Sequence, residues 1–404
     1  LYSLYKRFES AVGNETAEKK AHYGPAVDGG SPLAPWTYLN PELFELEYDA
    51  FFLRRWQFVG HVNEVISAGD YMTASIGRDN VVVLRGKDDE LRAFLNVCRH
   101  RGSRLLEGKG SCRGVVKCPY HGWTYRLDGK LLGVPQEEDF DDFSRADYGM
   151  HEISLEVFHG LVFVNVRGDG PTVAETFAHS AQYFEMYDVA NYVCFREESF
   201  QEWTVNWKVA WDNYLENYHI PVGHPGLFRL LEVTDIGEHL GNGANYGVFE
   251  LKDRPSSVDI EREYQEKFHF ANKRVPGEIK GQWVQFGVAG NLGIDLYPEM
   301  LDIFQLIPLS HDRTLVRAAY YGHPNPTKEE ERLRELNIAI NEPVNDEDRM
   351  LCERVQKGLR TTGYRPGPFS AEENTLLRFH AMVRRLVPVT SLDEAPPQGQ
   401  GAAE

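Results

Sequence analysis

Two short pairs of cysteine and histidine, Cys98/His100 and Cys118/His121, lie in one stretch of the sequence. Zinc sites are more often built from uniform pairs, two cysteines or two histidines at short spacing. A mixed set suits a [2Fe–2S] cluster in which two thiolates bind one iron and two imidazoles bind the other. We therefore predict two loops that clasp such a cluster from two sides, with a structural zinc knuckle as the alternative.

Histidine ligands make such a cluster less negative and raise its potential to roughly −150 to +300 mV, a range suited to passing single electrons to an O₂-activating site. The stretch between the pairs is strongly basic and contains one acid, Glu107; its six basic residues are Arg99, Arg101, Arg104, Lys109, Arg113 and Lys117. This basic collar can dock an acidic electron donor. It can equally balance the charge of the cluster or meet a neighbouring subunit.

A second ligand set is indicated by His219 and His224, which lie on either side of Pro221. Because proline interrupts a helix, the two histidines are not expected on one continuous helical face. Two imidazoles and one carboxylate form the ligand set of non-haem Fe(II) oxygenases, which leaves positions open for O₂ and substrate.

The third ligand is sought among Asp346, Glu347 and Asp348. Of these, Asp348 continues an apolar stripe formed by Val344, Leu351, Val355 and Leu359. An acid in phase with a buried stripe is costly unless it is paired or bound to a metal. Asp348 is therefore the predicted ligand, and a charged helix N-terminus is the alternative.

Glu216 lies three residues before His219, on the same helical face. A carboxylate there can accept the free N–H of an iron ligand of this subunit, or of a cluster ligand of a neighbour, and offer a path for an electron. An exposed helical glutamate is the alternative. Asn213 is a second candidate catalytic residue, and it and Asp212 can equally serve polar packing.

The composition limits the remaining possibilities. The 404 residues carry a net charge of −18, contain five cysteines and are 42% hydrophobic, which suits two packed domains. No apolar run of about eighteen residues indicates a membrane span, and the first residues do not resemble a secretion signal. The acidic charge disfavours binding to nucleic acid or an anionic membrane. Sparse cysteines and an iron–sulfur cluster predict a reducing compartment, the cytoplasm.

The pattern of elements divides the chain. Short strands separated by Gly, Asp and Asn predict a small antiparallel β domain over residues 45–168, with a hairpin at Asp128-Gly129. Residues 169–388 mix helix and strand, with an irregular section at 225–275 and a long helix that we expect to break at Pro343. Residues 1–44, with a helix near Leu4–Val12, are predicted to pack on this second domain. Residues 389–404 are predicted to form a loose tail.

With both motifs in view, the chain resembles the α subunit of Rieske non-haem iron oxygenases, also called ring-hydroxylating oxygenases. The resemblance covers almost the whole chain and rests on Cys98-x-His100-x17-Cys118-x2-His121, Asn206-Trp-Lys and Glu216-x2-His219-x4-His224-Pro. The segment from Glu347 to Gln356 resembles the place of the family's carboxylate ligand and supports Asp348. The family's fold is α+β: a small antiparallel β Rieske domain and a helix-grip (START-like) catalytic domain with a central antiparallel sheet and helices.

The resemblance implies a [2Fe–2S] Rieske cluster at the first four ligands and a mononuclear Fe(II) at the other three. It implies electrons from NAD(P)H through a flavin and iron–sulfur reductase or a ferredoxin, and the insertion of one or two oxygen atoms from O₂ into a small-molecule substrate. The family is generally a trimer, with or without a separate β subunit, in which the cluster of one subunit serves the iron of its neighbour across an acid. Glu216 matches that acid, and a homotrimer is expected.

The glutamate at this position departs from the aspartate usual in naphthalene- and benzoate-type enzymes. It resembles the branch that oxidises carnitine, glycine betaine and proline betaine. Hydroxylation or demethylation of a small quaternary ammonium compound is therefore favoured. The alternatives are mono- or dioxygenation of an aromatic acid and O-demethylation of a methoxyarene.

Two other classes compete. The second ligand set argues against an electron-transfer protein that uses the cluster alone, and a zinc-stabilised binding module of the same fold would not consume O₂.

Aromatic residues near the second ligand set are candidates for a substrate cavity: Trp211, Tyr214, Trp283, Phe286, Tyr297 and Phe304. They can surround a quaternary ammonium group or stack on an aromatic ring. Cys112, Cys194 and Cys352 fall outside the ligand spacing and are predicted not to bind metal. Cys194 and Cys352 are expected in the core.

Overall fold

The computed structural model describes residues 31–397, apart from 233–238, 242–243, 272–274, 276–280 and 289. The helix predicted near Leu4–Val12 lies outside this range. None of the helices in the described part combines the length and apolar character that a membrane span requires.

Short apolar strands in the first part of the chain pair into one antiparallel sheet in the order β1-β10-β9-β4-β3-β2-β5. Their bounds are β1 Gln57–His61, β2 Asp70–Ile76, β3 Asp79–Arg85, β4 Leu91–Leu95, β5 Lys109–Ser111, β9 Glu152–Phe158 and β10 Leu161–Asn165. Three further strands, β6 Val115–Lys117, β7 Thr124–Arg126 and β8 Leu131–Gly133, form a separate small sheet. The predicted hairpin turn is confirmed between β7 and β8, where Gly129 adopts a φ of 81°.

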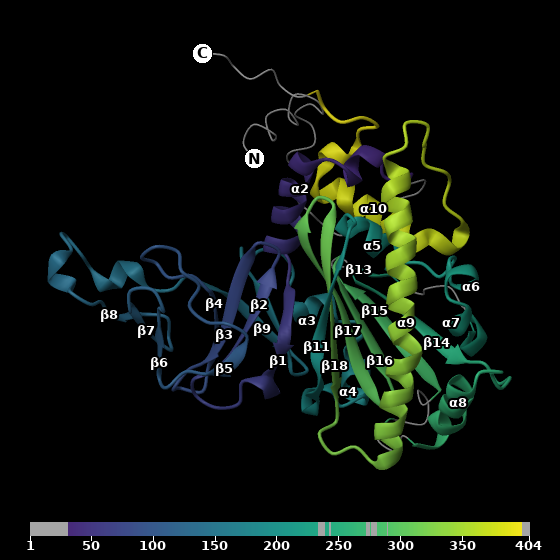
Figure 1. The fold of residues 1–404 in the computed structure, drawn as a ribbon, viewed down its shortest axis with the longest axis horizontal. Coiled ribbons are helices and arrows are strands. Elements are labelled where there is room, and N and C mark those ends of the chain that lie inside the picture. The colour runs from purple at the N-terminus through teal and green to yellow at the C-terminus, as the bar shows by residue number, and fades with distance from the viewer. Residues whose placement is uncertain are drawn as a thin grey trace.

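The second part is built around an antiparallel sheet in the order β11-β18-β17-β16-β15-β14-β12, with β13 paired to β14. The strands are β11 Val193–Trp203, β12 Leu231–Glu232, β13 His239–Gly241, β14 Ala244–Leu251, β15 Gln282–Val288, β16 Leu292–Tyr297, β17 Met300–Ser310 and β18 Arg313–Gly322. The long helix α9, Lys328–Leu359, lies across this sheet (Figure 1). Three antiparallel sheets and a helix held against the largest one confirm the predicted α+β class.

Shorter helices connect and cover these sheets. They are α2 Pro41–Glu47, α3 Val173–Thr176, α4 Ala181–Met186, α5 Trp207–Tyr214, α6 Ile220–Gly223, α7 Pro225–Leu230, α8 Asp259–Ala271 and α10 Asn374–Leu386. One buried apolar cluster continues from the first sheet, through Val81 and Val83, to Trp203 and Trp207 of the second part. The two parts therefore share a packed core.

Three expectations from the sequence need correction. Helix α9 continues through Pro343 without a break. The section 225–275 is not irregular throughout, because α7, β14 and α8 form within it. The tail is packed at its start: Val389 and Thr390 are buried, and the Leu392 carbonyl accepts a hydrogen bond from the Trp36 indole at 2.9 Å.

Candidate active site

The loops that carry the first ligand set share one turn geometry. In each loop a glycine donates its N–H to the carbonyl of the cysteine four residues earlier, Gly102 to Cys98 and Gly122 to Cys118, both at 3.1 Å. The two glycines have φ values of 71° and 75°, a conformation that other residues rarely adopt. The sequence thus folds into two matched loops that present their side chains toward one another.

The side chains at these positions fit a [2Fe–2S] cluster. Cys98 and Cys118 are buried and free of disulfides, and the rings of His100 and His121 lie with their centroids 4.6 Å apart. The Nδ1 atom of His100 is buried and has no hydrogen-bond partner within the described residues. A buried nitrogen without a partner is costly, and ligation to iron would satisfy it.

The sulfur atoms have polar neighbours of the kind that stabilise a thiolate. Burial raises the pKa of the Cys118 thiol, but hydrogen bonds, including those from the backbone N–H groups of Tyr120 and His121, outweigh it and lower the pKa. The Tyr125 hydroxyl lies 3.3 Å from Cys98 Sγ. Thiolates, rather than thiols, bind metal.

The basic collar is only partly an open surface. Arg101, Arg104, Arg113 and Lys117 are exposed, but Lys109 forms ion pairs with Glu64 and with Glu198, the latter at 2.7 Å. Lys109 therefore belongs to the contact between the two parts of the chain.

The second ligand set comes from three elements. His219 immediately precedes α6, and His224 lies between α6 and α7, so the two histidines do not share one helix. The third member, Asp348, comes from α9. Pro221 lies in the first turn of α6, and the chain leaves the helical conformation at His224, between α6 and α7.

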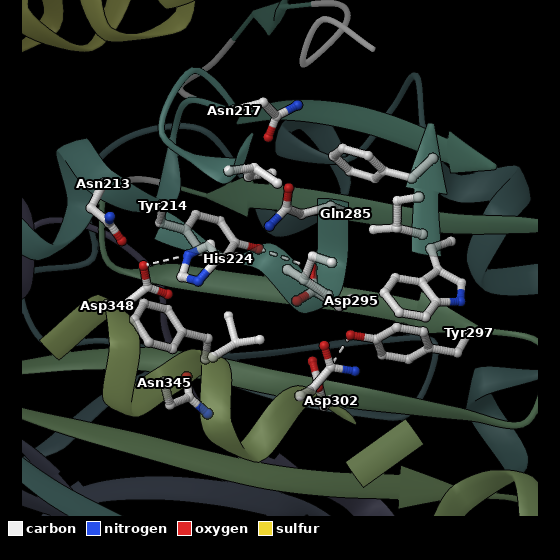
Figure 2. A pocket seen from close by; sticks show the side chains of 18 of the residues that line it. Asn213, Tyr214, Asn217, His224, Gln285, Asp295, Tyr297, Asp302, Asn345 and Asp348 are labelled. Atoms are coloured by element: carbon white, nitrogen blue, oxygen red, sulfur yellow. Dashed lines mark hydrogen bonds and ion pairs between the residues drawn. The ribbon is translucent and has the colours of Figure 1, made fainter. Parts of the chain in front are cut away.

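These three side chains converge on one point. The Nε2 atoms of His219 and His224 are 3.0 Å apart, and Asp348 Oδ1 lies 3.6 and 2.9 Å from them, respectively. Their potential ligand atoms all lie within 4.8 Å of one another, which makes them a candidate metal-binding group among the described residues. Figure 2 shows the His224–Asp348 contact. Two nitrogens and one carboxylate oxygen in this arrangement fit a divalent iron.

Two further carboxylates hold the opposite sides of the imidazole rings. Glu216 Oε1 lies 2.5 Å from His219 Nδ1, and Glu347 Oε2 lies 2.8 Å from His224 Nδ1. Burial lowers the pKa of His224, but its bonds to Asp348 and Glu347 outweigh this and raise the pKa above its ordinary value. Such partners direct the Nε2 lone pairs of both rings toward a metal. Glu347 was one of the three candidate carboxylates on this helix, but its contact with His224 was not predicted from the sequence.

Asn213 and Asp212, the two polar neighbours of the site, have different surroundings. Asn213 lines the cavity, and its Nδ2 lies 3.5 Å from His219 Nε2. Asp212 instead accepts a hydrogen bond from Tyr38 and lies 3.1 Å from His380 Nε2. Asp212 therefore serves polar packing between α5, α10 and the N-terminal segment.

A cavity of about 150 Å³ adjoins the three converging side chains. Cavities of this size accommodate a molecule such as benzene, which indicates a small ligand. Its walls come from α5–α7, strands β14–β18 and α9. The predicted aromatics Tyr214, Trp283, Tyr297 and Phe304 line it.

The prediction that Phe286 and Trp211 line the cavity is wrong. Phe286 is fully buried on the other face of β15, where it packs on Phe184. Trp211 is buried behind the cavity wall and stacks on Tyr214 at 5.0 Å. Side chains alternate between the two faces of a strand, so Phe286, three residues after Trp283, points to the opposite face of β15. Phe249 and Tyr320 line it instead.

A pair of aspartates forms another wall of the cavity. Asp295 of β16 and Asp302 of β17 are directly opposite one another in the strand register. Tyr214 donates a hydrogen bond to Asp295 at 3.0 Å, and Tyr297 donates one to Asp302 at 3.4 Å. Burial raises the pKa of Asp295 to about 7, and burial together with the charge of Asp295 raises the pKa of Asp302 well above its ordinary value. The sequence signal that could have identified this pair is an acidic residue inside each of two apolar strands.

Comparison with known proteins places these features in context. Residues 55–147 match the Rieske [2Fe-2S] domain, and residues 179–388 match the ring hydroxylating alpha subunit (catalytic domain). The glycine betaine monooxygenase oxygenase subunit of Pseudomonas aeruginosa (strain UCBPP-PA14) is 30% identical over 373 residues, which cover 82% of this chain and 83% of the relative. The chloroplastic choline monooxygenase of Arabidopsis thaliana is 28% identical over 382 residues, covering 89% and 83%.

A solved structure shows the same fold. It is that of a quaternary ammonium Rieske monooxygenase, described for carnitine oxidation by gut microbiota and inter-subunit electron transfer. It has a TM-score of 0.73 and 26% sequence identity to this chain, and the match covers 88% of this chain and 95% of that one.

Proposed function

Because the chain belongs to the family of ring-hydroxylating oxygenase α subunits, we propose that it hydroxylates or demethylates a small quaternary ammonium compound as a terminal oxygenase. Family membership, predicted from the two ligand motifs, is confirmed. The chain is accordingly an O₂-dependent oxidoreductase with a [2Fe–2S] Rieske cluster and a mononuclear iron. It takes electrons from a reductase or ferredoxin, as members of this family do.

One observation supports the choice of substrate class most strongly. The cavity beside His219, His224 and Asp348 is small, has aromatic walls and contains carboxyl groups. Aromatic faces and carboxylates both attract a cation. The similar proteins named above act on glycine betaine, choline and carnitine, each of which carries a trimethylammonium group.

The site residues have the following proposed roles. Cys98 and Cys118 bind one iron of the cluster, and His100 and His121 bind the other. His219, His224 and Asp348 hold the mononuclear iron, which when bound supplies the O₂ chemistry.

Residues around the iron ligands orient them. Glu216 holds His219 through Nδ1 and provides a route for an electron toward that ring, and Glu347 holds His224 in the same way. Asn213 lies close enough to His219 to hydrogen-bond a ligand in the open positions.

In the proposed reaction, one oxygen atom of O₂ is transferred to the substrate. A C–H bond beside the quaternary nitrogen becomes C–OH, and the second oxygen atom of O₂ leaves as water after taking up two electrons and two protons. Hydroxylation at a carbon attached to nitrogen gives a carbinolammonium, whose hydroxyl proton moves to the nitrogen as the C–N bond breaks, so that an aldehyde and a protonated tertiary amine are released.

The larger assembly extends this proposal. The reductase would draw electrons from NAD(P)H, and three copies of the chain would pass electrons from the cluster of one subunit to the iron of its neighbour. We retain the division into residues 1–44, 45–168, 169–388 and 389–404, and a cytoplasmic location, as parts of the proposal. A separate β subunit remains compatible with it.

The test is O₂ uptake by chemically reduced protein with choline, glycine betaine, carnitine and simple aromatic acids. We expect at least one quaternary amine to accelerate O₂ uptake and to yield an aldehyde, and the aromatic acids to have no effect. Oxidation of an aromatic acid alone would contradict the proposal and support the ring-hydroxylating alternative.

A further inference from the structure

The two sides of the cavity differ chemically. Figure 2 shows His224 and Asp348 on one side and Asp295 and Asp302 on the other. The first pair belongs to the proposed iron site. The second pair is not part of the metal-binding group found among the described residues, and its carboxyl groups accept hydrogen bonds from Tyr214 and Tyr297.

The aspartate pair has no basic partner in the cavity. Apart from the two iron-site histidines, the described residues that line the cavity include no lysine, arginine or histidine. Two carboxyl groups facing one another deep in a protein are costly unless a proton or a cation lies between them. The raised pKa values of both acids express this cost. Asp295 and Asp302 nevertheless keep part of their surface open to the cavity, where a ligand can reach them.

Aromatic rings complete the surroundings of the pair. The rings of Trp283 and Tyr297 lie 4.9 Å apart at 82° to one another, and Phe249 and Tyr320 also line the cavity. A quaternary nitrogen cannot donate a hydrogen bond, so it is recognised by charge and by aromatic faces. Both are present at this side of the cavity.

The other polar groups of the lining do not attract a carboxylate by charge. Asn213, Asn217, Gln285, Asn341 and Asn345 are uncharged amides, and Asp295 and Asp302 contribute only negative charge at their side of the cavity. A substrate that carries its own carboxylate would place it among like charges, and such contacts disfavour binding.

Building on the proposed function, we infer that Asp295 and Asp302, with the aromatic rings beside them, form a cation subsite that selects a monocationic amine without a carboxylate over a zwitterionic betaine. The ammonium group lies at the aspartate pair, and a carbon one or two bonds away points toward His219, His224 and Asp348. The subsite thereby determines both which quaternary amine binds and which carbon is oxidised.

Calorimetric titration of the metal-loaded protein tests this inference with three probes. Choline and glycine betaine share the trimethylammonium group and differ in a hydroxyl against a carboxylate. The third probe is the carbon isostere of choline, in which a quaternary carbon replaces the nitrogen. We expect choline to bind at least about tenfold more tightly than either of the others.

Variants that remove the charge of one aspartate test whether the pair causes the preference for choline. Asp295→Asn and Asp302→Asn keep the side-chain shape, and we expect each to reduce the preference for choline over glycine betaine by about tenfold. Asp253→Asn, at an exposed position outside the cavity, is the matched control and should leave the preference unchanged. Retained Rieske absorption and a native circular dichroism spectrum would show that each variant is folded.

Several outcomes would overturn the subsite. They are equal binding of choline and glycine betaine to the wild-type protein, equal binding of choline and its carbon isostere, no binding of choline, or an unchanged preference in both aspartate variants. Failure of the proposed function is a separate result: selective choline binding without oxidation of any amine would reject the activity and leave the subsite standing.

Discussion

At the scale of single residues, the iron site depends on the phase of α9. The sequence predicted Asp348 from a stripe that included Val355, yet Val355 is 52% exposed. The buried phase of the helix instead runs through Cys352 and Gln356, and Asp348 belongs to it one turn earlier. Periodicity thus selected, from a partly wrong stripe, the acid that the structure brings beside His219 and His224.

Asp348→Ala tests this residue directly. We expect loss of the mononuclear iron and of substrate turnover, because the remaining ligands are two imidazoles, while the Rieske absorption stays intact. The measurement is iron content together with the visible spectrum. Asp346→Ala, on the same helix but exposed, should retain both metals. Full iron occupancy in the Asp348 variant would move the ligand elsewhere.

Other residues could not be predicted because their roles depend on contacts between distant segments. Glu347 reaches His224 across 123 positions of sequence, and no local pattern encodes that contact. Asp295 and Asp302 become a pair only through the register of β16 and β17. The two ligand motifs, by contrast, are local, since their spacing reflects the tight loops that hold them.

At the scale of elements, the Asn206-Trp-Lys motif anchors α5. Asn206 caps the helix, and Trp207 and Lys208 donate hydrogen bonds to Glu47 of α2 at 3.0 and 2.9 Å. Lys208 and Glu47 are essentially inaccessible to solvent. This buried ion pair fixes the helix that carries Asn213 into the cavity.

Lys208→Met should destabilise the fold by about 3–5 kcal/mol, because it leaves Glu47 buried without its partner. Combining it with Glu47→Gln should recover a large part of the loss. Urea unfolding followed by tryptophan fluorescence measures both effects. Lys357→Met, at an exposed position of α9, is the control. A loss below about 1 kcal/mol in Lys208→Met would show that the pair does not anchor the helix.

Elements also show where local rules failed. Pro343 lacks a backbone N–H, and local propensity places a break there. Helix α9 continues because its residues on both sides of Pro343, including Leu336 and Cys352, are buried against the rest of the protein. Strands and hairpins of the first sheet were predictable, since their apolar runs and glycine turns are local signals.

At the scale of the whole molecule, the two proposed metal centres are far apart. Strands β6–β8, which flank the cluster ligands, lie at one end of the long axis, and α6 and α7, which flank the iron ligands, lie toward the other end (Figure 1). This separation within one chain supports the proposed transfer from the cluster of one subunit to the iron of a neighbouring subunit. A sequence pattern cannot show this separation, because it depends on the packing of both parts.

The central claim is that these two distant centres complete one reaction, each in a different subunit of a ring. Its most direct test co-expresses Cys118→Ser, without a cluster, and Asp348→Ala, without mononuclear iron, under different affinity tags. In trimers carrying both tags, one of three interfaces joins an intact cluster to an intact iron site, so we expect roughly a third of wild-type aldehyde formation from the preferred amine. Each variant alone should form none. Absence of product in the doubly tagged trimers would contradict the claim.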